Sequence, residues 1–579
     1  MAELSGGELI ARILKQEGVK VVFGIIDGTY FGFYSSLRKN GIQLIGPRHE
    51  TSALHMAAAY ARLTGELGVC MASNGPGVAN ALPGVAVENV EGNRVLLITS
   101  ARRVGIMYPD RGGTYQCFDQ TGVIRPMSKW SEHVPNFGRI TEMTHTALRM
   151  SWTGRPGVVH LDVPEDIINT KVKASPSLLS KNKFRQTEPL HPSEDQVERA
   201  AKMLLSAGMP LIHAGSGVIH ALAFDELART AELLDAPVTM SWCARGAAVE
   251  TTRVFPMIDV AMNNKLRNDA DVVLTLGSRL GETDWWGKAP YWRHPSKQKM
   301  IQVDIEGRWM GANKPIDLGI QADVKVFLQM LNAKIARARV PSRKTAIDRY
   351  NAERNRERAK LAENLKDDSS PMYPGHMAAI ARKVFPDDTI LVADGGNTTI
   401  WANFFWDVRK PNTILSTFKM GMLGAGVAQA LGACVARPKS KVLCIIGDGA
   451  MGFHPQEIET AVRNKLKPIY VVACDRQWGM VKMNQQFALK PIKTLIKKSL
   501  GPHETINADL GEIRFDLLAQ SMGAHGERVS TPAEFKKALE RSLAADKCAV
   551  IHVDVNPVKH MWVPGLIYFK DMHKEPKGK

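Results

Sequence analysis

Short apolar runs that alternate with helical patterns recur along most of the chain. In the first part of the sequence the runs VVFGII, QLIGP, LGVCMAS, RVLLITS and GVVHLDV are separated by segments with helical spacing. Strands that are apolar throughout and alternate with helices are typical of parallel sheets covered on both faces. The sequence therefore predicts an α/β protein built from doubly wound parallel sheets.

Two polar segments divide this alternation into three blocks. Residues 171–196 have the composition of a linker, and residues 333–368 are so rich in charge that they suit an exposed connecting helix. With 579 residues the chain is also too long for a single hydrophobic core. We therefore expect domains at residues 1–170, 190–335 and 370–558, followed by a tail at 559–579 that can close over the site as a lid.

The formal net charge of +17 does not by itself identify the kind of ligand or partner that the protein binds. The 75 basic residues are spread along the chain and match no nucleic-acid-binding module, so an anionic small molecule explains the excess equally well. No apolar run approaches the roughly 20 residues that a membrane span needs. Seven scattered cysteines without a CxxC pair, and an N-terminus without a signal sequence, favour a cytoplasmic protein whose partners include neither nucleic acid nor membrane.

The strongest local motif is the Gly-Asp-Gly at residues 447–449, at the end of an apolar strand pattern. A helix is expected from about His454, and a second apolar strand ends at Asp475. Because parallel strands end at the same sheet edge, Asp448 and Asp475 can face each other there. Two carboxylates, nearby glycines and a helix N-terminus suit Mg²⁺ and a diphosphate. The alternative is an ordinary tight turn with Asp448 as a helix cap.

This segment resembles the diphosphate and metal motif of thiamine-diphosphate-dependent enzymes, and the likeness extends over nearly the whole chain. In the first block it includes GPRHETSALHMAAAYARLTG, SNGPGVANAL, RGGTYQCFDQ and GVVHLDVPEDI, and in the third block DGGNTTIW and KMGMLGAGVAQALGA. The resemblance implies a pyrimidine-binding domain, a central domain and a diphosphate-binding domain, in that order. It also implies thiamine diphosphate and Mg²⁺ as cofactors.

The resemblance further implies roles for individual residues. Asp448, Asp475 and the backbone carbonyl of Gln477 correspond to the metal ligands. Glu50 corresponds to the glutamate that approaches the pyrimidine ring from the partner subunit, and Gln116 to a polar residue over the reacting centre. The remaining cofactor contacts correspond to Asn397, Thr398, Gly449 and Ala450 at the diphosphate, to Leu423 beneath the folded cofactor, and to the Gly421 carbonyl at its 4'-amino group.

One position departs from the family pattern. Where the family usually has two consecutive asparagines, this chain has Cys474 and Asp475. Aspartate still suits Mg²⁺, but it adds a negative charge beside a diphosphate. We expect Arg476 or a nearby lysine to offset that charge.

The resemblance leaves the reaction open. Acetolactate-synthase-like enzymes, 2-hydroxyacyl-CoA lyases and oxalyl-CoA decarboxylases share these motifs, while GSRLGETDWW and IQVDIEGRWMGANKP resemble the lyase and oxalyl-CoA branch more closely. The favoured interpretation is a transferase or lyase that makes or breaks a carbon–carbon bond next to a carbonyl of a 2-oxo acid, aldehyde, ketone or acyl-CoA. The alternatives are a 2-oxo acid or oxalyl-CoA decarboxylase, and a catalytically silent relative that binds the cofactor.

The family also suggests further ligands and an assembly. Its central domain holds FAD in synthases and ADP in the lyase and oxalyl-CoA branch, and the AGSG at residues 214–217 is too short to choose between ADP, FAD and neither. Because the family's active site lies between two chains, we expect a homodimer or a homotetramer.

Overall fold

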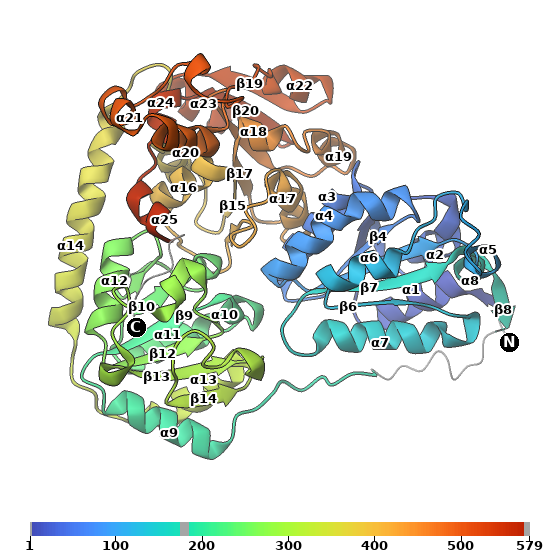
Figure 1. Ribbon diagram of the computed structural model, residues 1–579, viewed down its shortest axis with the longest axis horizontal. Helices are drawn as coiled ribbons and strands as arrows, with labels where there is room; N and C mark the ends of the chain where they lie inside the picture. Colours follow the sequence, from blue (N-terminus) through green and yellow to red (C-terminus); the bar gives the residue numbers. More distant parts are fainter. Residues whose placement is uncertain (1–2, 174–183, 573–579) are drawn as a thin grey trace.

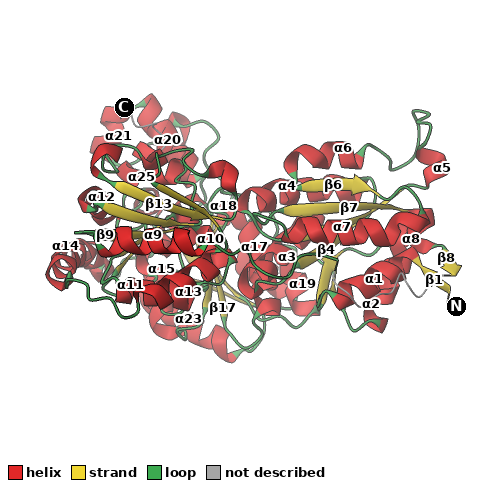
Figure 2. Ribbon diagram, turned by 90° about the horizontal axis from the view of Figure 1, so that it is seen from below, coloured by secondary structure: helices red, strands yellow, loops and turns green. Residues whose placement is uncertain are grey.

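The computed structural model describes residues 3–173 and 184–572. Three six-stranded sheets, parallel throughout, form the centres of three α/β units, and helices cover both faces of each sheet (Figures 1 and 2). This architecture confirms the predicted fold class. Among the described residues, none of the helices combines the length and apolarity that a bilayer crossing requires.

The first sheet has the spatial order β3-β2-β4-β5-β7-β6. Its central strands are buried along their whole length, which explains why their sequences are apolar without alternation. A two-stranded antiparallel ribbon joins β1 (Glu3–Ser5) to β8 (Lys171–Lys173). The sheet consists of β2 (Val21–Gly24), β3 (Gln43–Ile45), β4 (Gly68–Ala72), β5 (Val95–Ala101), β6 (Trp130–His133) and β7 (Val158–Pro164); its main helices are α1 (Gly6–Gln16), α2 (Phe31–Lys39), α3 (Glu50–Thr64), α4 (Pro76–Glu91) and α7 (Ile140–Trp152).

The third sheet, β16-β15-β17-β18-β20-β19, repeats the strand order of the first. Numbered within each sheet, both read second, first, third, fourth, sixth, fifth. The two units therefore share a topology although their sequences show no residue-level repeat. The strands are β15 (Ile390–Asp394), β16 (Ile414–Leu415), β17 (Val442–Gly447), β18 (Ile469–Cys474), β19 (His525–Val529) and β20 (Ala549–Asp554); the main helices are α15 (Gly375–Val384), α16 (Gly396–Phe405), α17 (Ala425–Ala436), α18 (Asp448–Met451), α19 (Glu457–Arg463), α20 (Gly479–Leu489), α21 (Pro491–Lys497), α22 (Phe515–Ser521) and α23 (Pro532–Ala544).

The central sheet has a different order, β11-β10-β9-β12-β13-β14. This is the order of dinucleotide-binding folds, in which a crevice opens where the order reverses, here between β9 and β12. The strands are β9 (Pro210–Ala214), β10 (Val238–Met240), β11 (Val254–Phe255), β12 (Val272–Leu276), β13 (Lys299–Asp304) and β14 (Leu318–Gln321); the main helices are α9 (Glu194–Leu205), α10 (Ser216–His220), α11 (Phe224–Leu233), α12 (Val260–Asp269) and α13 (Val324–Ile335).

Helix α14 (Lys344–Glu363) runs along the outside of the molecule from the central unit to the third (Figure 1). Ile347 and Tyr350 are buried, whereas most of the other residues of the helix are exposed or half-buried. The charged segment is thus an exposed connecting helix, as its composition predicts.

The first and third units are joined by helix packing. Helix α3 lies along α17, and the two contribute to one hydrophobic core. Gly432 permits this close approach, because a Cβ added there would lie only 2.3 Å from the carbonyl oxygen of Met56. The beginning of α3 also contacts the third unit, where the rings of His49 and His454 are 5.3 Å apart.

The chain ends in two short helices, α24 (Pro557–Met561) and α25 (Leu566–Met572). The side chain of Asn556 caps α24 by accepting from the backbone N–H groups of Val558 and Lys559, at 3.1 and 3.0 Å. Helix α25 lies between the third and central units, against the 3₁₀ helix η6 (Glu282–Gly287) (Figure 1). Residues 573–579 of the expected tail lie outside the described residues.

Candidate active site

Asp448 and Asp475 follow neighbouring parallel strands. Gly447 of β17 pairs with Ala473 of β18, so both carboxylates lie at the same edge of the third sheet. The local structure differs from the prediction, because a one-turn helix α18 begins at Asp448 itself and the next helix begins only at Glu457. The glycine-rich turn thus leads directly into a helix, without the intervening loop that the sequence indicated.

Asp448 is held by two backbone N–H groups. Its Oδ1 accepts from Gly449 and its Oδ2 from Arg476, both at 2.7 Å. Burial, together with the negative charge of Asp475, raises the pKa of Asp448 to about 6. A carboxylate whose ionisation a neighbouring carboxylate disfavours forms a site at which a cation is strongly stabilised.

Asp475 is paired with a histidine that sequence reasoning missed. Its Oδ2 lies 2.6 Å from Nδ1 of His560 and accepts from Nε2 of Gln477 at 3.0 Å. Arg476 does not play the expected part: its side chain is exposed, and its backbone N–H bonds to Asp448. His560 follows the last strand at the same sheet edge, so the rule that parallel strands end together offered a signal for it.

Asn397 and Thr398 open helix α16 beside the two carboxylates. Asn397 is only 4 % exposed, and within the described residues neither its amide nitrogen nor its oxygen has a hydrogen-bond partner. A Cβ at Gly479 would lie 2.6 Å from that nitrogen and 3.6 Å from Oδ2 of Asp475, so the amide and the carboxylate border the same space. A buried, unpaired amide costs about 1–3 kcal/mol, which a polar ligand would offset.

The other expected cofactor contacts surround this space less closely. Gly421 is exposed and has φ +62°, a conformation that favours glycine, and Leu423 packs at the margin of the shared core. Ala450 is buried in α18, next to Gly449, where a Cβ would lie 2.7 Å from the Trp478 ring. The carboxylates, the unpaired amide and the glycine turn together fit a divalent cation shared with a diphosphate.

Asp394, which the sequence did not single out, joins two segments near the site. It ends β15, and it accepts from the N–H of Gly395 at 2.5 Å and of Gly426 at 2.7 Å. Burial raises the pKa of Asp394 to about 6. It therefore fixes the beginnings of α16 and α17 relative to each other.

Glu50 and Gln116 lie together on the first unit, at the N-terminal end of α4. Glu50 is 8 % exposed, its Oε2 accepts from Nδ2 of Asn80 at 3.1 Å, and a Cβ at Gly77 would lie 3.3 Å from its Oε1. Gln116 has a left-handed backbone, φ +53°, and a Cβ at Gly75 would lie 2.8 Å from its Cβ. Such backbone strain is typical of functional loops.

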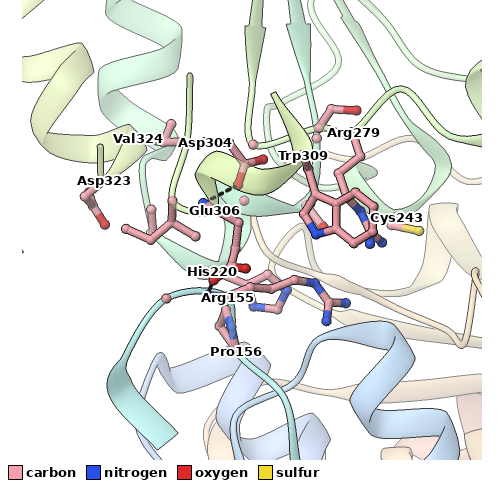
Figure 3. A pocket seen from close by; sticks show the side chains of 18 of the residues that line it. Arg155, Pro156, His220, Cys243, Arg279, Asp304, Glu306, Trp309, Asp323 and Val324 are labelled. Atoms are coloured by element: carbon pink, nitrogen blue, oxygen red, sulfur yellow. Dashed lines mark hydrogen bonds between the residues drawn. The ribbon is translucent and has the colours of Figure 1, made fainter. Parts of the chain in front are cut away.

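A separate cleft of about 1110 Å³ opens at the carboxyl ends of β9, β12 and β13, against the first unit (Figure 3). Its floor is made of glycines, because a Cβ at Gly217 would lie 2.6 Å from Cα of Gly277. Arg155 and Arg279 lie on its walls, where burial and, to a smaller extent, the charge of Arg279 lower the pKa of Arg155. The AGSG at residues 214–217 is thus a strand-to-helix turn at a cleft with two guanidinium groups.

Acidic and aromatic side chains complete the walls of this cleft. Asp304 ends β13 and accepts from the N–H of Glu306 at 2.9 Å, and Oε1 of Glu306 accepts from the N–H of Arg155 at 3.1 Å (Figure 3). The guanidinium of Arg279 lies 5.5 Å from the ring of Trp309. The cleft can therefore offer an anion-binding side and a flat aromatic surface to one ligand.

Comparison with known families identifies the class of this protein. Residues 4–123 match the N-terminal TPP-binding domain of thiamine pyrophosphate enzymes, residues 197–331 the central domain, and residues 394–553 the C-terminal TPP-binding domain. The chain therefore belongs to the thiamine-diphosphate-dependent enzymes, as the resemblance predicted. Each matched region lies in one of the three α/β units; the central match spans its whole sheet, whereas the N-terminal match ends before β6 and β7.

Individual relatives narrow the group. The chain is 27 % identical to a probable acetolactate synthase large subunit of Methanocaldococcus jannaschii, covering 96 % of this chain and 93 % of that one. It is 28 % identical to a sulfoacetaldehyde acetyltransferase of Castellaniella defragrans, with 95 % and 93 % covered, and 27 % identical to an oxalyl-CoA decarboxylase of Escherichia coli K12, with 95 % of each covered. The protein is a thiamine-diphosphate-dependent enzyme of the acetolactate synthase and oxalyl-CoA decarboxylase group.

Proposed function

We propose that this enzyme uses thiamine diphosphate and Mg²⁺ to make or break a carbon–carbon bond next to a carbonyl. The observation that carries the proposal is the half-buried Asp448 and the buried Asp475 beside the unpaired amide of Asn397. When bound, thiamine diphosphate supplies a carbon nucleophile and an electron sink. The protein supplies the groups that bind it, orient it and control its protons.

The binding roles are those that the family resemblance implies for these positions. We assign Mg²⁺ to Asp448, Asp475 and the backbone carbonyl of Gln477, since carboxylate and carbonyl oxygens are its preferred ligands. The diphosphate would meet the amide of Asn397 and the beginning of α18. Thr398, Gly449 and Ala450 complete that contact, and Gly421 and Leu423 would border the pyrimidine end.

Glu50 would hold and release a proton at the pyrimidine ring, and the family resemblance implies that it does so across an interface with a second copy of the chain. Its carboxylate lies near Gly77, at one end of α4, whereas Glu91 at the other end accepts from the N–H groups of Lys419 and Met420 at 2.7 and 3.0 Å. From Gly77 to Glu91 the helix rises about 21 Å. The contacts of Glu50 and of the loop leading to Gly421 thus lie at opposite ends of α4, and we propose a homodimer as the minimum assembly, with a homotetramer left open.

Gln116 would face the substrate, since it borders Gly75, two residues before the Gly77 that borders Glu50. The substrate class we propose is a 2-oxo acid, aldehyde, ketone or acyl-CoA. Decarboxylation of a 2-oxo acid or of oxalyl-CoA is the second candidate, favoured by the oxalyl-CoA decarboxylase among the relatives. The test is product analysis of the Mg²⁺-loaded enzyme with pyruvate, 2-hydroxyacyl-CoA and oxalyl-CoA: joined or cleaved carbon chains support the first candidate, and carbon dioxide with an unjoined product supports the second.

We further propose that the central cleft binds ADP or FAD. The reversal of strand order, the glycine floor and the guanidinium groups of Arg155 and Arg279 support a nucleotide there. Mass spectrometry of nucleotides released from the purified protein, with its visible absorbance, distinguishes ADP, FAD and neither.

A further inference from the structure

This chain has an aspartate, Asp475, at a position where its family usually has asparagine. What is inferred from this difference rests on the proposed function, in which Asp475 is a metal ligand. Compared with asparagine, Asp475 brings one more negative charge next to Asp448 and to a diphosphate. Two side chains contact Asp475, the amide of Gln477 and the imidazole of His560, and of these only the imidazole can carry a positive charge.

The two carboxylate oxygens of Asp475 differ in their hydrogen bonds. Oδ2 accepts from Nε2 of Gln477 at 3.0 Å and lies 2.6 Å from Nδ1 of His560. Because a carboxylate can only accept, the proton of that second bond belongs to Nδ1 of His560. Oδ1 has no hydrogen bond within the described residues, so it is the oxygen left for a metal ion.

The other ring nitrogen of His560 points to the diphosphate side of the site. Its Nε2 lies 3.2 Å from Oγ1 of Thr398, the residue next to Asn397 in α16. One imidazole, 3 % exposed, therefore connects a proposed metal ligand with a proposed diphosphate contact. Partners of metal ligands fix the orientation of those ligands in this way.

The backbone around His560 is held by the same elements whose side chains it connects. The indole N–H of Trp401, in α16, donates to the carbonyl oxygen of His560 at 2.9 Å. The Gln477 amide donates to the carbonyl oxygen of Pro557, at the beginning of α24, at 2.8 Å. The imidazole is therefore positioned before any ligand arrives.

We propose that His560 is a positioning residue that makes Asp475 a usable Mg²⁺ ligand. It orients the carboxylate by bonding Oδ2, leaves Oδ1 to the cation, and supplies a hydrogen-bond donor against the additional charge. Asparagine at 475 would need less of this help, since it carries no charge.

The test is a double-mutant cycle on the full-length chain. Apoprotein is titrated with Mg²⁺ at a fixed concentration of thiamine diphosphate, by calorimetry, for the wild type, His560→Ala, His560→Asn, Asp475→Asn and the double variant Asp475→Asn/His560→Ala. The matched control is His160→Asn, since His160 is also buried and both its ring nitrogens lie 2.7 Å from hydroxyl oxygens, but in the first unit. Thermal unfolding of each apoprotein reports whether it is folded.

We expect His560→Ala to weaken Mg²⁺ affinity by about 10- to 100-fold, as is typical for a partner of a metal ligand. His560→Asn, whose amide can still donate to Asp475, should recover most of that loss. In the Asp475→Asn background the same alanine change should cost less than about threefold. His160→Asn should leave the affinity unchanged.

An equal loss from His560→Ala in both backgrounds would overturn the inference, because His560 would then only support α24. Failure of His560→Asn to recover affinity, when that variant is folded, would also contradict it. A wild type that binds thiamine diphosphate without any dependence on Mg²⁺ would overturn the proposed function itself, and this outcome is distinct from both.

Discussion

The carboxyl edges of the third and central sheets differ in charge. At the third sheet, Asp448 and Asp475 follow neighbouring strands, and at the central sheet Arg279 follows β12 and faces Arg155 across the cleft. Both edges arise from the same parallel architecture, so the fold does not choose the ligand. The ligand is determined by a few residues at the strand ends. The carboxylates of the third sheet require a cation before they can hold an anion, whereas the guanidinium groups at the central sheet can hold an anion directly.

The largest expected effect is the loss of cofactor binding at the third sheet while nucleotide binding at the central sheet is kept. Asp448→Ala removes a carboxylate for which no neighbour substitutes, so Mg²⁺-dependent binding of thiamine diphosphate should become undetectable by calorimetry. Nucleotide retained in the central cleft should be unaffected. Asp475→Asn, which restores the usual family residue, should keep or improve cofactor binding; if it eliminated binding as completely as Asp448→Ala, the role of Asp475 as a ligand would be refuted.

The Glu50→Gln variant should still bind thiamine diphosphate at the third sheet and a nucleotide at the central sheet, and yet stop the reaction. An amide cannot exchange the proton that a carboxyl group exchanges with the pyrimidine ring, and such acid–base steps are typically worth about 10²- to 10⁴-fold in rate. Steady-state rates with the accepted substrate, together with cofactor affinity, test this prediction. A decrease of only a few-fold would show that Glu50 is not the proton-transferring group.

Arg279→Met should weaken nucleotide binding at the central sheet and leave cofactor binding at the third sheet unchanged. Removal of a charged hydrogen-bond donor to a phosphate is worth about 10- to 100-fold in affinity, so ADP or FAD binding should fall by that amount. The matched control is Arg308→Met, because Arg308 is 71 % exposed and forms a surface ion pair with Glu306 at 3.0 Å. Equal losses in the two variants would indicate a general charge effect and not a specific contact.

Acidification should weaken Mg²⁺ binding at the third sheet more than nucleotide binding at the central sheet. The pKa of Asp448, raised to about 6 by burial and by Asp475, means that the apoprotein takes up a proton there as the pH falls below 6, and Mg²⁺ must displace it. Mg²⁺ affinity should therefore fall about tenfold between pH 7 and pH 5. In the apoprotein the same raised pKa destabilises the fold as pH rises through 6, because the folded state binds the proton more tightly than the unfolded state. Nucleotide affinity at the central edge should change less over this range.

The smallest expected effect concerns the tail, which we propose covers the diphosphate edge. Truncation after Val563 keeps His560 but removes α25, which lies between the two edges against η6. Turnover should fall a few-fold, and release of incomplete product should rise, because water would reach the site more easily. Unchanged kinetics would show that α25 is not a lid.

The sequence predicted the interior of each sheet better than its margins. Within the three six-stranded sheets of the described chain, the strands that the apolar runs did not reveal, β6, β11, β14 and β19, lie at sheet edges. Edge strands are short and polar, as in WSEH and HGERV, because one side faces solvent and charge there prevents unwanted pairing. Hydrophobicity therefore does not mark β6 or β19, although it marks the edge strand β3.

The site shows the same division between local and distant information. The Gly-Asp-Gly turn and its two carboxylates lie within one stretch of chain and were predictable. The contact between Asp475 and His560 joins residues 85 positions apart; the strand topology places both at one sheet edge, and the three-dimensional structure shows that they are in contact. The one-turn helix at Asp448 was missed because four residues carry too little periodicity to be recognised.

The shared core of α3 and α17 has a consequence for synthesis of the chain. While the ribosome makes the first 424 residues, α3 lacks the helix that covers it, and its alanine-rich surface waits for Ala425–Ala436 to emerge. The central unit has its own core and needs no such partner. We therefore expect the middle of the chain to reach its final structure before the beginning does, and a newly made N-terminal segment to depend on chaperones in the interval.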